Sequence, residues 1–191
     1  MPSKSKTIIA VGRIDAWHCK GFDLVIDAWS KVANRFSDWK LKIVGAGEES
    51  SVEFLKNKAR EECVEDQFEI CSFSHSIEDI YLDASIFVLS SRYEGFGLVL
   101  IEAMSQGCAC VACDYNGRQR ELLEDGRDAL VCDAGDVETM ANDIALLISN
   151  DDLRHRIQKN AILRSHYFDI SHVMDRWNDI LKESIHISIK G

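Results

Sequence analysis

Proline is almost absent from this sequence, in which Pro2 is the only one, and there is no linker, low-complexity segment or internal repeat. No apolar run reaches the roughly 18 residues that a membrane-spanning helix needs. The first residues lead directly into a strand-like segment, without the apolar core of a signal peptide. With 46% hydrophobic residues in a length of 191, we expect one soluble, cytoplasmic domain over residues 1–191.

Positive charge is scarce as well. The sequence has 22 lysine and arginine residues against 32 aspartate and glutamate residues, which gives a formal net charge of −10. Nucleic acids and anionic membrane surfaces are bound by clusters of lysine and arginine. The composition therefore argues against a nucleic-acid partner and against a patch for an anionic membrane.

The seven cysteines include no C-x-x-C pair. Cys108, Cys110 and Cys113 lie close together, but they belong to an apolar run that is typical of a buried strand, where thiols behave as small hydrophobic groups. No second pair of ligands has the spacing of a zinc site. We interpret these cysteines as core residues, and reduced thiols fit a cytosolic compartment.

Up to Cys132, apolar segments of strand length alternate with segments of helical spacing. The strand-like runs are Thr7–Val11, Leu41–Val44, Phe68–Cys71, Ile86–Leu89, Cys108–Ala112 and Ala129–Cys132. The helix-like segments are Phe22–Phe36, Ser51–Glu62, Ile77–Leu82, Leu98–Gln106 and Gln119–Glu124. Such alternation builds right-handed βαβ units around a parallel sheet that is buried on both faces. The sequence thus predicts an α/β fold with a doubly wound, six-stranded parallel sheet.

Beyond this region the pattern predicts helices alone. Asp136, Asp151 and Ser171 have the side chains that favour the N-cap position. Trp177 lies among apolar residues at helical spacing in the last segment, so that this helix needs a surface to cover. The predicted C-terminal helices are Asp136–Ser149, Asp151–Tyr167 and about Ser171–Ser184.

In open parallel sheets, ligands bind outside the carboxyl ends of the strands. Arg13 follows the first strand, and Lys20 precedes the glycine that opens the first helix. Arginine offers a planar fork to phosphate oxygens and lysine offers a mobile point charge. The pair predicts an anion site, and the alternative is that both are solvated surface cations.

The turn after the second strand, Gly45-Ala46-Gly47, resembles a dinucleotide-binding fingerprint without its third glycine. The next strand is followed by Ser72-Phe73-Ser74 instead of an acid that could bind a ribose. As a signal for NAD this is weak, and we interpret the turn as one that admits a backbone close to a ligand. His18 and His75 lie in the same set of loops, where exposed histidines are most often only solvated.

The segment from Glu94 to Glu102 is the most informative. The residues after Gly97 are apolar almost all round and predict a buried helix, in which the charge of Glu102 needs a partner. Helical side chains lean toward their own N-terminus, so we expect Glu102 to point back at Gly95–Gly97. Two carboxylates would then converge on a glycine-lined helix N-terminus, which suits an anion with attached hydroxyls.

In their order and spacing, the Gly-Arg, Lys-Gly and Gly-x-Gly elements and Glu-Gly-Phe-Gly-x4-Glu resemble glycosyltransferase family 4, also called group 1. The resemblance runs from Ile8 to about Tyr167 and into the final helix. It implies one half of a GT-B fold, in which two Rossmann-like domains face each other across a cleft. The chain resembles the C-terminal, donor-binding half, and residues 171–191 would pack against the N-terminal acceptor domain, which is absent here.

The resemblance also implies roles for the residues around the donor, a nucleotide-diphosphate-sugar in which uracil is the frequent base. Arg13 and Lys20 would hold the diphosphate, together with the backbone amides of Gly97 and Leu98. The family works without a bound metal or other cofactor and retains the anomeric configuration. Preorganised donors of this kind stabilise the charge that develops on the leaving diphosphate.

On the sugar side, the resemblance implies that Glu94 is the catalytic carboxylate and contacts the donor sugar, beside the loop residues Gly95 and Phe96. Glu102 would accept hydrogen bonds from the ribose hydroxyls. The stretch of Ser72 and Phe73 would border the nucleobase. The sequence departs from the family pattern here, since Ser72 replaces a frequent glycine.

Two further departures concern other loops. Compared with the shortest versions of the family, two extra residues lie between Arg13 and Lys20. The usual Gly-Gly-x-Pro-Glu pattern is reduced to Asn116-Gly117 and a displaced Glu121, without proline. The second departure weakens any inference about the sugar.

The resemblance implies a hexosyltransferase that moves a sugar, most simply from a UDP-sugar, to a glycan or lipid-linked acceptor. The full-length enzyme would work in the cytoplasm or at the cytoplasmic face of the membrane, and this chain alone would be inactive. The alternatives are a GT-B-like nucleotide-sugar epimerase and an inactive nucleotide-binding regulatory module. The interpretation of the chain as a dehydrogenase would rest on the Gly45-x-Gly47 turn alone.

Overall fold

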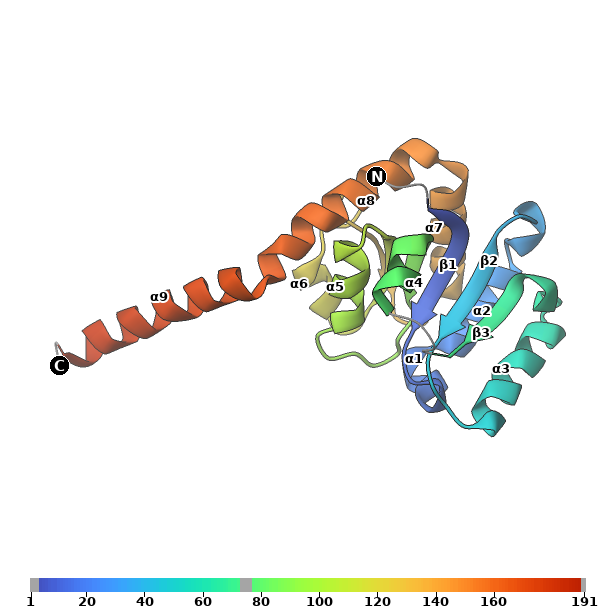
Figure 1. Ribbon diagram of the computed structural model, residues 1–191, viewed down its shortest axis with the longest axis horizontal. Coiled ribbons are helices and arrows are strands. Elements are labelled where there is room, and N and C mark those ends of the chain that lie inside the picture. The colour runs from blue at the N-terminus through green and yellow to red at the C-terminus, as the bar shows by residue number, and fades with distance from the viewer. Residues whose placement is uncertain (1–3, 73–76, 190–191) are drawn as a thin grey trace.

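The computed structural model describes residues 4–72 and 77–189, with the side chains described up to Lys182. Within these residues, six strands form one parallel sheet in the order β3-β2-β1-β4-β5-β6 (Figure 1). This is the strand order of a Rossmann fold, with β1 and β4 at the switch point. The strands are β1 (Ser5–Val11), β2 (Lys40–Val44), β3 (Phe68–Cys71), β4 (Ala84–Leu89), β5 (Ala109–Asp114) and β6 (Leu130–Asp133).

Helices follow the strands as the sequence predicts. The α-helices are α1 (Trp17–Lys20), α2 (Phe22–Ser30), α3 (Glu49–Glu61), α4 (Ile77–Asp83), α5 (Leu98–Ser105), α6 (Arg118–Leu122), α7 (Val137–Ser149), α8 (Asp151–Ser165) and α9 (Ile170–Ile189). Short 3-10 turns are η1 (Ile14–Ala16), η2 (Ala33–Arg35), η3 (Glu65–Gln67) and η4 (His166–Phe168).

The sheet is covered on both faces, which confirms the doubly wound α/β fold. On one face, a core cluster joins the alternate strand residues Ile8, Ile43 and Val88 to α2, α3 and α7. On the other face, a second cluster joins Ile9 and Phe87 to α4, α5 and α8. The strands are apolar in both directions because each face packs against helices, which is why they show no polar alternation.

Several helix ends differ from the prediction. The segment predicted as one helix to Phe36 is α2, which ends at Ser30, followed by η2. Asp136 caps α7 as expected, since its carboxylate accepts the Thr139 N–H at 2.9 Å. The cap of α8 is Asn150, which accepts the N–H of Leu153 at 2.9 Å, so Asp151 lies inside the helix.

The last helix begins one residue before the predicted cap, so Ser171 lies inside α9. In Figure 1, α9 projects away from the body of the domain. Its side chains Ile170, Met174, Trp177 and Leu181 are 82%, 52%, 56% and 52% exposed. These residues recur at intervals of four and three, which places them along one side of a helix. The helix thus carries an apolar stripe that the described part of the domain does not cover.

The cysteines predicted to be core residues lie in the core. Cys108, Cys110 and Cys113 are at most 1% exposed, and the last two belong to β5. Cys113 pairs in register with Cys132 of β6, and their sulfur atoms are 3.6 Å apart as free thiols. Burial raises the pKa of the Cys108 thiol to about 12, so that this side chain is neutral at physiological pH.

Candidate functional site

The loops that follow β1 and β2 touch each other at the carboxyl edge of the sheet. The Gly12 N–H donates to the Val44 carbonyl at 3.0 Å, and a Cβ on Gly45 would lie only 1.8 Å from the Gly12 oxygen. A Cβ on Gly47 would lie 2.6 Å from Cβ of Ile14. The Gly-x-Gly turn therefore serves a close contact within the protein. This contact by itself accounts for both glycines, and the approach of a ligand to the turn stays a prediction.

Lys20 and Glu94 form an ion pair at this edge. Lys20 ends α1, and its Nζ lies 2.9 Å from Oε2 of Glu94, with the two side chains 24% and 12% exposed. Glu94 also accepts the Ser91 hydroxyl and the Gly95 N–H, each at 3.1 Å. The resemblance assigns the two charges to different parts of a ligand, and their pairing was not predicted. Residues so far apart in the sequence carry no local signal of such a contact.

Arg92, which was not predicted as a site residue, also contributes to this edge. Its guanidinium donates to both carboxylate oxygens of Asp23 at 2.7 Å and to the His18 carbonyl at 2.8 Å. The Arg92 N–H donates to the Cys19 carbonyl at 2.9 Å. The bond to Asp23 raises the pKa of Arg92 above its ordinary value. Arg92 thus fastens the loop before Glu94 to α2 and to α1, the helix that ends at Lys20.

Arg13 differs from Lys20 in being available. It directly precedes η1 and is exposed, and its side chain makes no hydrogen bond or ion pair with any residue in the described ranges. His18, in the same loop, is also exposed and its ring lies edge-on to Trp17. One cation of this loop is therefore held by the protein and the other faces solvent.

Glu102 does not lie in the buried setting that we predicted. The residue is exposed, and its Oε2 accepts the hydroxyl of Tyr81 at 3.1 Å. The prediction was wrong because α5 has one buried face, formed by Leu100, Ala103 and Met104, and Glu102 lies off it. Its described partner lies in α4 and not in the loop of Gly95–Gly97, so the predicted convergence with Glu94 is not observed.

The loop before α5 ends in a glycine cap. Gly97 has φ of +80° and forms the N-cap of α5, a left-handed conformation that favours glycine. Gly95 and Phe96 are exposed, and the Phe96 ring meets Phe168 of η4 edge-on, with centroids 5.7 Å apart. Leu98 is 66% exposed. The first backbone N–H groups of α5 are free of helical partners and lie at this edge.

On the opposite side of the edge, Ser72 is exposed and directly follows β3. Phe73 and His75, which the sequence analysis also considered, lie outside the described residues. A cavity of about 550 Å³ adjoins Ser72 and has Val44 and Ile70 among its lining residues. The structure thus offers an open, partly apolar space beside the loop that the resemblance assigns to a nucleobase.

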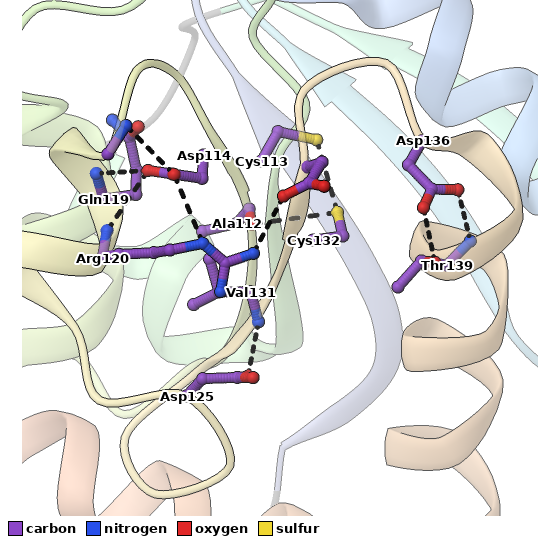
Figure 2. Close-up of polar contacts among 12 residues, drawn as sticks. Ala112, Cys113, Asp114, Gln119, Arg120, Asp125, Val131, Cys132, Asp136 and Thr139 are labelled. Carbon is purple, nitrogen blue, oxygen red and sulfur yellow. Dashed lines mark hydrogen bonds and ion pairs between the residues drawn. The ribbon is translucent and has the colours of Figure 1, made fainter.

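The loop after β5 is stabilised internally, as Figure 2 shows. The Asp114 carboxylate accepts the backbone N–H groups of Gly117 at 3.1 Å and Gln119 at 2.9 Å. Arg120 lies between Asp114 and Asp133, with Nε at 3.3 Å from the Asp114 carboxylate and Nη2 at 3.0 Å from the Asp133 carboxylate. The bond to Asp133 raises the pKa of Arg120. Asp114 therefore acts as a cap of α6.

Over residues 4–72 and 77–189, no three or more histidine, cysteine, aspartate or glutamate side chains are grouped as a metal ion would require. Within the same ranges, no helix combines the length and the apolar character needed to cross a membrane.

Comparison with known proteins identifies the family. The model of the family described as "Glycosyl transferases group 1" matches residues 1–164. The chain belongs to this family. An uncharacterized glycosyltransferase from Haemophilus influenzae is 34% identical over 178 residues, which cover 93% of this chain and 49% of that protein. The chain spans about half the length of these curated relatives that it matches.

Solved structures place this group 1 chain within the GT-B fold. The C-terminal domain of the group 1 protein LpcC from Francisella tularensis is 26% identical with a TM-score of 0.76, covering 87% of this chain and 88% of that one. HepE from Anabaena shares the fold with a TM-score of 0.82 at 24% identity, over 94% of this chain and 49% of its own length. The expected correspondence to the C-terminal domain of a GT-B protein is confirmed.

Proposed function

We propose that this chain is the donor-binding half of a retaining glycosyltransferase that transfers a sugar from a UDP-sugar to a glycan or lipid-linked acceptor. The observation that carries the proposal is the arrangement at the carboxyl edge of a group 1 domain. There Lys20, at the end of α1, pairs with Glu94 in the loop before α5. Arg13, in the loop after β1, is exposed and has no side-chain partner among the described residues. Cations and helix N-termini are the groups that bind a diphosphate.

The comparisons support the choice of donor and acceptor. HepE was crystallised with UDP and with UDP-glucose, and pneumococcal GtfA with UDP and N-acetylglucosamine. Among the relatives by sequence, AmsD from Erwinia amylovora is named for amylovoran biosynthesis. A Campylobacter jejuni relative is named for transfer to a diphospho-undecaprenol substrate. From these proteins we infer that the donor of this chain is a UDP-sugar and that the acceptor is a glycan or a lipid-linked molecule.

In this proposal, Arg13 and Lys20 hold the diphosphate together with the N–H groups of Gly97 and Leu98. These groups are in place before the reaction, so they stabilise the negative charge that grows on the leaving diphosphate. The arrangement needs no metal ion or other cofactor for this purpose. Lys20 would exchange part of its contact with Glu94 for a phosphate oxygen.

The remaining roles follow the same assignment. Glu94 lies against the donor sugar beside Gly95 and Phe96, and Glu102 accepts the ribose hydroxyls through its exposed carboxylate. Ser72 borders the nucleobase at the mouth of the adjoining cavity. The ribose role of Glu102 rests on its exposure and on the free oxygen Oε1, which has no hydrogen-bond partner among the described residues.

The acceptor half of the enzyme would be supplied by a polypeptide segment that this chain does not contain. We propose that the apolar stripe of α9, formed by Ile170, Met174, Trp177 and Leu181, packs against that half. The chain spans about half of its relatives, which leaves room for such a segment. In the absence of that half, the chain alone is expected to bind donor without transferring sugar, at the cytoplasmic side of the cell.

Titration calorimetry with UDP, GDP, ADP and NAD tests the proposal. UDP is expected to bind with a Kd of roughly 10 μM to 1 mM, because half of the cleft is missing. Arg13→Ala should weaken UDP about tenfold and leave uridine unaffected, since a charge-assisted hydrogen bond contributes about 1.5–3 kcal/mol. Arg156→Ala, at an exposed position of α8, is the matched control. Preferential binding of NAD, or no binding of any nucleoside diphosphate, would contradict the proposal.

A further inference from the structure

Tyr81 is a buried residue whose hydroxyl group forms one hydrogen bond, to Glu102. Its side chain is 1% exposed and packs edge-on against Phe87, with ring centroids 6.1 Å apart. Its hydroxyl reaches the surface of the core at Oε2 of Glu102, to which it donates at 3.1 Å. The backbone is also fixed, because the Tyr81 carbonyl accepts the Lys4 ammonium at 2.9 Å and the Cys108 thiol at 3.2 Å. The donor atom therefore has little freedom to move.

Glu102, in contrast, is an exposed glutamate in the second turn of α5. A glutamate side chain at a helix surface loses substantial rotamer entropy when a ligand fixes it. The bond from Tyr81 holds one oxygen of the carboxylate against α4 before any ligand arrives. The second oxygen, Oε1, accepts no hydrogen bond from a described residue. The contact thus presents one carboxylate oxygen in a defined position.

The Tyr81 hydroxyl is suited to donate at physiological pH. Burial, followed by the nearby charge of Glu102, raises the pKa of Tyr81 well above its ordinary value. The hydroxyl is therefore neutral and always carries its proton. A small cavity of about 200 Å³ lies where α4 and α5 meet and is lined by Ile77, Glu78, Tyr81, Glu102, Ser105 and Gln106. Glu102 thus lies beside open space that a ligand can enter.

We propose that Tyr81 is a positioning residue, which orients Glu102 so that its second oxygen accepts the ribose hydroxyls of the nucleotide. This inference rests on the proposed function, since it needs Glu102 to bind ribose. It adds a residue from α4 to a site that the sequence places wholly in the loops and α5. The burial of Tyr81 alone does not explain its hydroxyl, because phenylalanine would fill the same space in the core.

The test compares UDP with 2′,3′-dideoxyuridine 5′-diphosphate, which lacks both ribose hydroxyls, by calorimetry on the intact chain. Wild-type protein is expected to prefer UDP about tenfold or more. Tyr81→Phe should reduce this preference by about three- to tenfold and leave the affinity for the dideoxy compound unchanged. In a Glu102→Ala background, Tyr81→Phe should have no further effect on the preference. Tyr167→Phe, which removes an exposed hydroxyl from η4, is the matched control.

The outcomes separate this inference from the proposed function. If UDP does not bind, or if wild-type protein does not distinguish the two nucleotides, the role of Glu102 in ribose binding fails and the inference falls with it. If wild-type protein does distinguish them and Tyr81→Phe keeps the full preference, the positioning role alone is overturned. An effect of Tyr81→Phe that is equal for both nucleotides, or that persists without Glu102, also overturns it, because a purely structural role would give that result.

Discussion

Glu94 and Glu102 belong to one short segment and yet have opposite surroundings. Glu94 is largely buried between a cation, a hydroxyl and a backbone N–H. Glu102 is exposed and has a neutral hydroxyl as its described partner. The difference arises because Glu94 precedes α5, where the loop packs against the end of α1, whereas Glu102 lies on an open side of the helix. At the scale of residues, the two carboxylates are therefore expected to respond differently to substitution.

Glu94→Gln is expected to strengthen the binding of UDP by about two- to fivefold. Glutamine removes the negative charge that competes with the diphosphate for Lys20, and charge-assisted bonds are about twice as strong as neutral ones. For a UDP-sugar the gain should be smaller, because a contact with the sugar is altered as well. Calorimetry with both compounds measures the difference. Glu65→Gln, at an exposed position, controls for the change in net charge, and weaker binding of UDP would contradict the competition.

Asp143, in α7, predicts a dependence of stability on pH. Burial, together with the nearby charges of Asp125 and Asp136, raises the pKa of Asp143 to about 6. Its ordinary pKa is lower, so the native state binds more protons than the unfolded state between about pH 4 and pH 6. The free energy of unfolding therefore falls as the pH rises through that interval, and the penalty is complete above about pH 6.

Asp143→Asn is accordingly expected to raise the free energy of unfolding by about 1–2 kcal/mol at pH 7.5 and by much less at pH 4. Urea unfolding at the two pH values measures the difference. Asp152→Asn, at an exposed position of α8, provides the control for a lost surface charge. An equal gain at both pH values would show that the titration of Asp143 is not its cause.

At the scale of elements, the junction of α7 and α8 is held by one side chain. Arg154, in the first turns of α8, donates to the carbonyls of Leu147 at 2.7 Å and Ile148 at 3.2 Å, which close the last turn of α7. It also pairs with Asp151 at 2.6 Å and lies over the ring of Trp39 at 5.4 Å. Arg154 thus caps one helix from the next and joins both to the core.

Arg154→Ala is expected to lower the free energy of unfolding by about 2–4 kcal/mol. The substitution leaves two carbonyl groups without their donor in a largely buried position, and an unsatisfied buried polar group costs about 1–3 kcal/mol. Lost packing against Trp39 adds to the effect. Chemical unfolding followed by far-UV circular dichroism measures the change. Arg156→Ala, two residues further along α8 and exposed, should change stability by less than about 0.5 kcal/mol.

At the scale of the whole molecule, the core of the domain is fully covered, whereas the C-terminal helix α9 is exposed. Both faces of the sheet are covered by helices, while α9 carries its apolar stripe away from them (Figure 1). Contiguous exposed apolar surface of this kind marks an interaction site. In the proposed function, the carboxyl edge of the sheet, with Arg13 and Lys20, is the other surface that a second half would cover.

Because the α9 stripe is exposed, it is expected to make the chain associate at high concentration. Sedimentation velocity over a concentration series should show a shift toward larger species. Trp177→Ser should suppress this shift, because tryptophan contributes the largest apolar surface of the stripe. Leu146→Ser removes an exposed apolar side chain from α7 and should leave association unchanged. Equal association of wild-type and Trp177→Ser protein would exclude the stripe as its cause.

The strands and most helices could be predicted from the sequence because their signals are local. Runs such as Ile86–Leu89 are apolar at every position, which identifies a strand buried on both faces. The sequence could also predict which loops lie together, for a topological reason, since the ends of parallel strands meet at one edge. That this edge binds a ligand stays a prediction. The predicted helix ends were less accurate where two neighbouring residues can both serve as the cap. At the start of α8, Asn150 takes the cap position that was predicted for Asp151.

The sequence by itself determined the order of strands and helices along the chain, the family, and the segments that bear Arg13, Lys20, Glu94 and Glu102. Only the tertiary structure decided which of these side chains is paired, exposed or free. Lys20 meets Glu94 and Tyr81 meets Glu102 across long stretches of sequence. Hydrophobic periodicity is set by each residue and its near neighbours, whereas such contacts depend on how whole elements pack. Apolar residues around Glu102 therefore could not reveal that its side of α5 faces solvent.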